Sequence, residues 1–270
     1  MKIGIFDSGL GGLIMTKALI KALPEYDYAY LGDTANLPYG ARSAEQVCAL
    51  TTRCVDWLFR EQDCALVLIA CNTATIAALK YLQTEYLPAN FPGSPPERCI
   101  LGVTGTTVEA VAAGGFSRVG LIATEGTIRS GAYEEELRRL VPGISVKSLA
   151  TPLLVPLIEN GGDKYAPAVI ADYMEPFSDV QALVLGCTHY PHYRELFARQ
   201  LPQAKIISQD EIIPAALSAY LAQHRELEPK LSRGGGRFFG ITDITGSYSS
   251  QAERIFGEKI AVTDVVLPFK

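Results

Sequence analysis

The sequence lacks the features of membrane-spanning and secreted proteins. No stretch approaches the roughly 20 apolar residues that a membrane-spanning helix needs. The N-terminus reads Met-Lys-Ile-Gly-Ile-Phe-Asp7, and its short apolar run meets a carboxylate too early for a signal peptide. We therefore expect a cytoplasmic protein with no membrane partner.

Basic residues and metal-ligand motifs are also scarce. Acidic residues outnumber basic ones by 29 to 24, so the net charge of −5 offers no surface for nucleic acid and suits a protein that handles small molecules. Three histidines and the lack of any Cys-x-x-Cys pair argue against a zinc site, and we expect no bound metal. The six cysteines are expected to be free thiols in a reducing cytoplasm.

The composition is that of a globular protein, and the order of the apolar patterns indicates the α/β class. Of the 270 residues, 48% are apolar and 20% are charged, and a chain of this length can bury a large core. Apolar runs alternate with helical patterns, as in parallel sheets whose strands are joined by helices. Strands are expected at 2–6, 28–31, the run ending at Cys71, 99–103, 119–123, 145–149, 182–185, 205–207 and 237–242. Helices are expected at about 12–23, 43–60, 72–82, 107–113, 130–140, 165–175, 213–223 and 249–256, with a turn or short helix at 155–159.

A proline-rich segment indicates where one domain ends. Pro88–Pro96 holds four of the sixteen prolines and is the best candidate for a crossover between domains. After it, the alternation of strands and helices starts again. We predict two α/β domains with mainly parallel sheets and the active site in the cleft between them. Residues 1–95 with 209–270 would form the first domain, and residues 96–208 the second.

Two cysteines lie in matching sequence contexts. Cys71 follows the apolar run Ala-Leu-Val-Leu-Ile-Ala, and Cys187 follows Ala-Leu-Val-Leu-Gly. Such runs are typical of strands buried on both faces, and α/β sites gather at the carboxyl ends of strands. Because small hydrogen-bonding residues follow both, we predict that these cysteines face each other across a cleft. The other cysteines are interpreted as small buried hydrophobic residues: Cys48, Cys54, Cys64 and Cys99.

Turns after the first two strands supply candidate ligand-binding residues. In Asp7-Ser-Gly-Leu-Gly-Gly12 a strand turns into a helix, so Asp7 and Ser8 could contact the ammonium group and carboxylate of a ligand. The alternative is a tight turn with Asp7 as its cap. Tyr39 and Gly40 could form one wall of a pocket, or their segment could be a plain turn.

The residues that follow the two cysteines are candidates as well. Asn72, Thr73 and Thr188 could hold a carboxylate through side-chain and backbone donors. Asn72 or Thr73 could instead cap a helix. His189 is close enough to Cys187 to share a proton with it, and the alternative is a hydrogen-bonded loop histidine.

Three loop carboxylates could support such a site. Asp33, Glu159 and Asp163 could polarise a thiol or orient His189. The remaining histidines are interpreted differently. His192 is expected to be structural, and His224 is expected to be solvated at the polar end of a helix.

Paired thiols suit the inversion of an amino-acid α-carbon. A carboxylate acidifies that carbon poorly, so a base is needed on one face and an acid on the other. A thiol has an unperturbed pKa near about 8.5, which a helix N-terminus or neighbouring donors can lower. One cysteine could therefore act as a thiolate base while the other acts as a thiol acid, and no cofactor is required. A cysteine hydrolase would need only one thiol and a base.

At these motifs the chain resembles the cofactor-independent glutamate racemases of the aspartate/glutamate racemase superfamily. The resemblance runs nearly end to end and rests on Phe6-Asp-Ser-Gly-Leu-Gly-Gly12, Gly32-Asp-Thr-Ala-Asn-Leu-Pro-Tyr-Gly40, Ala70-Cys-Asn-Thr-Ala74, Gly126-Thr-Ile128, Val155-Pro-Leu-Ile-Glu159 and Leu185-Gly-Cys-Thr-His-Tyr-Pro191. It implies that Cys71 and Cys187 exchange the α-proton of glutamate without a cofactor. It also implies a homodimer, a role in supplying D-glutamate for peptidoglycan, and substrate contacts from Asp7, Ser8, Tyr39, Gly40, Asn72, Thr73, Thr188 and His189.

Two segments depart from the family pattern. Gly102-Val-Thr-Gly-Thr-Thr107 stands where members usually carry Glu-Pro or a similar pair, and Thr151-Pro152 stands where many carry Cys-Pro. The segments around both cysteines are intact. Three other functions stay open: racemisation of aspartate or another amino acid, hydrolysis by Cys187 with His189, and amino-acid binding without catalysis.

Overall fold

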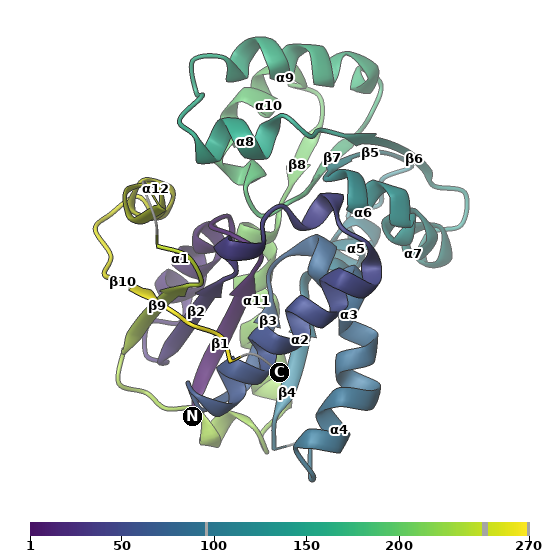
Figure 1. Ribbon diagram of the computed structural model, residues 1–270. Helices are drawn as coiled ribbons and strands as arrows, with labels where there is room; N and C mark the ends of the chain where they lie inside the picture. The colour runs from purple at the N-terminus through teal and green to yellow at the C-terminus, as the bar shows by residue number, and fades with distance from the viewer. Residues whose placement is uncertain (95–96, 245–247, 269–270) are drawn as a thin grey trace.

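The computed structural model describes residues 1–94, 97–244 and 248–268, which form two sheets, one below the other in Figure 1. The larger sheet has the strand order β10-β9-β2-β1-β3-β4, the smaller one β6-β5-β7-β8, and neighbouring strands are parallel throughout. This confirms the predicted α/β class with mainly parallel sheets. The strands are β1 (Lys2–Asp7), β2 (Tyr28–Gly32), β3 (Cys64–Ile69), β4 (Cys99–Gly102), β5 (Arg118–Ala123), β6 (Ser145–Ala150), β7 (Ala182–Gly186), β8 (Lys205–Ile207), β9 (Arg237–Ile241) and β10 (Val262–Asp264).

Helices join the strands and cover the sheets (Figure 1). Their starts follow local signals, as where the hydroxyl of Ser43 accepts a hydrogen bond from the Gln46 amide and caps α2. The helices are α1 (Gly12–Ala22), α2 (Ala44–Arg60), α3 (Asn72–Tyr81), α4 (Leu87–Asn90), α5 (Val103–Ala113), α6 (Glu125–Ser130), α7 (Ala132–Leu140), α8 (Leu154–Glu159), α9 (Ala166–Met174), α10 (Arg194–Gln200), α11 (Gln209–Gln223) and α12 (Tyr248–Phe256). A π-helical turn, Leu82–Tyr86, connects α3 to α4.

Some element boundaries differ from the predicted ones. The helix predicted at 130–140 corresponds to α7 and begins two residues later than predicted, while α6 precedes it as a helix that was not predicted, and Gly131, with φ of 67°, separates the two. Helices α5 and α11 each begin four residues earlier than predicted, at Val103 and Gln209. Strand β10 has no counterpart among the predicted strands, since its three residues carry little pattern and are ordered by pairing with β9.

Strand β4 belongs to a different sheet from the one predicted. Cys99–Gly102 pairs with β3 in the six-stranded sheet, although it falls in the range 96–208 assigned to the second domain. Consecutive strands joined by a helix usually lie side by side, so β3, α3 and β4 form one unit. The predicted boundary between residues 95 and 96 lies outside the described residues. The chain passes to the second sheet through α5 and returns through α11.

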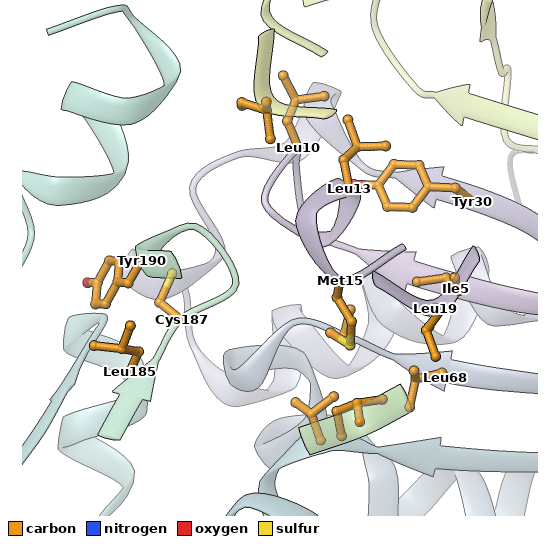
Figure 2. Close-up of a cluster of buried hydrophobic side chains, with 14 of the residues drawn as sticks. Ile5, Leu10, Leu13, Met15, Leu19, Tyr30, Leu68, Leu185, Cys187 and Tyr190 are labelled. Carbon is orange, nitrogen blue, oxygen red and sulfur yellow. The ribbon is translucent and has the colours of Figure 1, made fainter. Parts of the chain in front are cut away.

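The strands that lead to the two cysteines are buried on both faces. Every residue of β3 and of β7 is buried, as expected for parallel strands covered by helices on both sides. One contiguous apolar cluster spans both sheets and includes Ile5, Leu68, Leu185 and Cys187 (Figure 2). In the part of the chain that the structure describes, no helix is both long enough and apolar enough to cross a membrane.

Candidate active site

A cavity of about 560 Å³ lies where the carboxyl ends of strands from both sheets meet. Ser8 and Cys71 follow β1 and β3 of the larger sheet, and Thr124, Thr151 and Cys187 follow β5, β6 and β7 of the smaller one. Ligands of α/β proteins bind at this end of the strands. Of the residues singled out in the sequence, the cavity is lined by Ser8, Tyr39, Gly40, Cys71, Asn72, Thr73, Glu159, Cys187, Thr188 and His189.

Cys71 is the cap of helix α3. Its sulfur accepts a hydrogen bond from the Ala74 amide at 3.5 Å, so the cap is neither Asn72 nor Thr73. Burial and the nearby Asp7 carboxylate raise the pKa of the Cys71 thiol to about 12, although hydrogen bonds from Ser8 and Ala74 oppose this rise. A thiol with such a pKa keeps its proton at neutral pH, which is the form that a proton donor needs.

Cys187 lies beside the imidazole of His189. His189 Nδ1 is 3.7 Å from the Cys187 sulfur, and His189 Nε2 is 2.9 Å from Oε1 of Glu159. Burial lowers the pKa of His189, but the sulfur and the Glu159 carboxylate together raise it well above its ordinary value. The two cysteines therefore have different surroundings: the Asp7 carboxylate lies near Cys71, and the His189 imidazole lies beside Cys187.

Asp7 lies behind the cavity wall. Its buried carboxylate accepts hydrogen bonds from the Gly9 amide at 3.1 Å and from the Thr188 hydroxyl at 3.2 Å. Burial raises its pKa, while His189 and these donors lower it. Asp7 thus connects the turn after β1 to the loop after β7, and it contacts the lining residue Thr188 rather than the cavity itself.

Asp33 is also buried behind the wall and holds the loop that carries Tyr39. Its carboxylate accepts hydrogen bonds from Tyr39 Oη (2.7 Å), Asn36 Nδ2 (3.0 Å) and Thr242 Oγ1 (2.7 Å). Neither the Cys71 nor the Cys187 sulfur is among its hydrogen-bond partners. Of the two roles predicted for Asp33 and Glu159, orienting His189 matches the position of Glu159 alone.

The structure adds lining residues that the sequence analysis did not single out. The Thr73 hydroxyl is hydrogen-bonded to those of Thr124 (2.9 Å) and Thr127 (3.2 Å), which connects α3 to α6. Thr124 follows a buried strand, as the cysteines do, so the same signal could have found it. Tyr248 and Gln251 reach the cavity from α12, and no local pattern indicates this.

The two departures from the family pattern have different positions. Thr151 lines the cavity, and its hydroxyl is 2.7 Å from that of Tyr190. Thr104 and Gly105 lie on α5 and are not among the lining residues.

Among residues 1–94, 97–244 and 248–268, no three His, Cys, Asp or Glu side chains form a group that could hold a metal ion. Thiols, hydroxyls and amides converging on one cavity suit a small polar ligand.

The sequence is similar to those of known racemases. The family model described as Asp/Glu/Hydantoin racemase matches residues 3–216. The chain is 38% identical over 264 residues to the glutamate racemase of Aquifex aeolicus, covering 96% of each chain. It is 35% identical over 264 residues to that of Geobacter metallireducens, covering 96% of this chain and 93% of the relative.

A solved structure is similar over almost the whole fold. The glutamate racemase of Francisella tularensis, crystallised in complex with D-glutamate, superposes with a TM-score of 0.85 at 31% sequence identity. The match covers 98% of this chain and 97% of that one. The arrangement of two parallel sheets is therefore shared with a protein whose ligand is an amino acid.

Proposed function

The chain belongs to the Asp/Glu/Hydantoin racemase family, and we propose that it inverts the α-carbon of glutamate with Cys71 and Cys187 on opposite faces of the substrate. It is an isomerase of the glutamate racemase type. Glutamate racemases supply D-glutamate for peptidoglycan, and we propose the same role here. The observation that carries the two-cysteine mechanism is that both thiols line one cavity, each from a strand of a different sheet.

In this mechanism one cysteine acts as the base. Its thiolate takes the α-proton of glutamate and becomes a thiol, while the thiol of the other cysteine donates a proton to the opposite face and becomes a thiolate. Protons and charge balance, and the reverse reaction exchanges the two roles. Exclusion of water by the bound substrate would strengthen the hydrogen bonds that stabilise the developing carbanion.

The lining residues supply partners for the rest of the substrate. Ser8, Asn72, Thr73 and Thr188 carry hydroxyl or amide donors suited to carboxylates. Asp7 holds Thr188 from behind, and Asp33 holds Tyr39, so both act as positioning residues rather than as contacts.

Solvent exchange tests the proposed reaction. Purified protein is incubated with D-glutamate in deuterium oxide without added cofactor, and optical rotation and α-proton loss are followed together. We expect rotation to fall to zero while deuterium enters the product, because the proton that the second thiol delivers comes from solvent. D-aspartate, one methylene shorter, is run in parallel, and faster turnover of it would favour the alternative substrate. If neither D-glutamate nor D-aspartate loses its α-proton, the result would favour amino-acid binding without catalysis.

A close contact between the sheets gives a further prediction for this site. A Cβ at Gly11 would lie 2.3 Å from His189 Nδ1 and 2.5 Å from Thr188 Oγ1. Gly11→Ala should therefore displace the loop after β7 and lower kcat/KM by about 100-fold, as misplacement by about 1 Å can do. The control is Gly105→Ala, since a Cβ there meets nothing within 4 Å. Equal activity of the two variants would contradict the prediction.

The assembly is also part of the proposal. We propose that the protein is a cytoplasmic homodimer. We also propose that each sheet forms the centre of one domain and that the chain passes between the domains through α5 and α11. The domain division is supported by the separate hydrogen-bonded strand order of each sheet. The dimer is supported by the family resemblance, and sedimentation equilibrium of the purified protein tests it.

A further inference from the structure

Four buried polar side chains form a hydrogen-bonded cluster beside the cavity. Asn72, Thr107, Tyr133 and Gln209 come from α3, α5, α7 and α11, and each is at most 3% exposed. Asn72 and Gln209 pair through both amides: Asn72 Nδ2 donates to Gln209 Oε1 at 3.0 Å, and Gln209 Nε2 donates to Asn72 Oδ1 at 2.7 Å. Buried polar groups that are satisfied in this way hold one arrangement, because leaving any of them unpaired is costly.

Tyr133 determines which way the Asn72 amide is turned. Its hydroxyl donates to Asn72 Oδ1 at 2.6 Å and accepts from Gln209 Nε2 at 3.1 Å. Burial raises the pKa of Tyr133, so its hydroxyl keeps the proton that it donates. With Oδ1 held by two donors and one Nδ2 hydrogen used on Gln209, the second Nδ2 hydrogen of Asn72 is left for a ligand in the cavity that this residue lines.

The cluster also lies where the chain passes between the sheets. Gln209 is the first residue of α11, which returns the chain to the larger sheet, and Thr107 is on α5, which leaves it. Gln209 Nε2 is 3.3 Å from the Thr107 hydroxyl, so both crossing helices contribute to the cluster. Asn72 directly follows Cys71. The orientation of the Asn72 amide therefore depends on the positions of both crossing helices, α5 and α11.

From these contacts we infer that Tyr133 and Gln209 are positioning residues, which hold the Asn72 amide in the orientation that binds a substrate carboxylate next to Cys71. This inference rests on the proposed function and names residues that support it without touching the substrate. It assigns Tyr133 and Gln209 an effect on substrate binding through Asn72. The proton transfers themselves are left to the two cysteines.

The test compares Tyr133→Phe with Thr107→Val. Both remove one buried hydroxyl that is hydrogen-bonded to Gln209, but only Tyr133 also donates to Asn72. We expect Tyr133→Phe to raise the KM for D-glutamate by about tenfold, the effect of a hydrogen bond worth about 1.4 kcal/mol, with kcat within about twofold. Thr107→Val should raise KM by no more than about twofold, since Gln209 keeps its hydrogen bonds to Asn72 and Tyr133. Gln209→Met should raise KM as Tyr133→Phe does.

A double-mutant cycle distinguishes positioning from a general structural effect. If Tyr133 acts through Asn72, then Tyr133→Phe should change KM by less than about twofold when Asn72 is already alanine. Melting temperatures of all variants are measured alongside. An unchanged KM in Tyr133→Phe, or the same increase in the Asn72→Ala background, would overturn the inference. The wild-type assay separates the two proposals, because an inactive wild type contradicts the proposed function itself.

Discussion

Replacing Cys71 or Cys187 by alanine is expected to lower the rate of glutamate racemisation by at least about 10³-fold. A positioned acid or base contributes roughly 10²–10⁴-fold to a proton transfer, and each turnover needs both groups. Both side chains line the cavity and each is 7% exposed. The rate is measured by polarimetry in both directions, with circular dichroism to show that each variant is folded.

The matched control for these variants is Cys99→Ala. Cys99 has the same exposed fraction of 7%, but it lies in β4 and does not line the cavity. It should racemise glutamate at the wild-type rate. Full activity in either Cys71→Ala or Cys187→Ala would contradict a two-cysteine mechanism. Loss in Cys187→Ala with no loss in Cys71→Ala would instead favour the single-cysteine hydrolase.

Replacing Glu159 by glutamine is expected to shift the pH dependence of the reaction. The Glu159 carboxylate, 2.9 Å from His189 Nε2, is one of the interactions that raise the pKa of His189. A neutral amide removes this interaction, so the imidazole loses its proton at a lower pH than in the wild type. If the imidazolium supports Cys187, the alkaline limb of the kcat profile moves to lower pH. At a fixed alkaline pH, kcat should fall by about 10- to 100-fold.

Stability should change with pH in a related way. Because the folded pKa of His189 is raised, its contribution to the free energy of unfolding is full below the unfolded pKa, near about 6.5, and is lost as pH rises through the folded pKa. Glu159→Gln should therefore lose more stability at pH 6 than at high pH. Chemical denaturation across this range measures the difference.

The chain offers a matched control for this variant too. Asp163 accepts a hydrogen bond from His192 Nε2 at 3.1 Å, a second carboxylate–imidazole pair that does not line the cavity. Asp163→Asn should leave the kcat profile in place. An unchanged alkaline limb in Glu159→Gln would show that the charge of His189 does not take part in the rate.

The sequence alone was sufficient for features set by neighbouring residues. Apolar runs such as those before Cys71 and Cys187 predict buried parallel strands, and residues at the ends of such strands meet at one edge of a sheet. For this reason Ser8, Asn72, Thr73 and Thr188 could be named as cavity residues before any contact was known. The helix predicted at about 43–60 likewise matches α2, which Ser43 caps.

Features that join distant parts of the chain could not be predicted in this way. The Asn72–Gln209 pair spans 137 residues, and Tyr248 reaches the cavity from the C-terminal segment. Strand β4 was assigned to the wrong sheet because its four residues carry no signal that distinguishes one sheet from the other. Periodicity reports which face of an element is buried, but not against which partner it packs.

By itself, then, the sequence was enough to predict the α/β class and to name the two thiols and the neighbouring polar residues as members of the site. These depend on burial and hydrogen bonding along short segments. Only the tertiary structure decided that Glu159 would meet His189, that Asp7 and Asp33 would lie behind the wall, and that both crossing helices would meet beside the cavity. Such contacts depend on the relative position of the two sheets, which is set by many side-chain contacts between residues far apart in the chain.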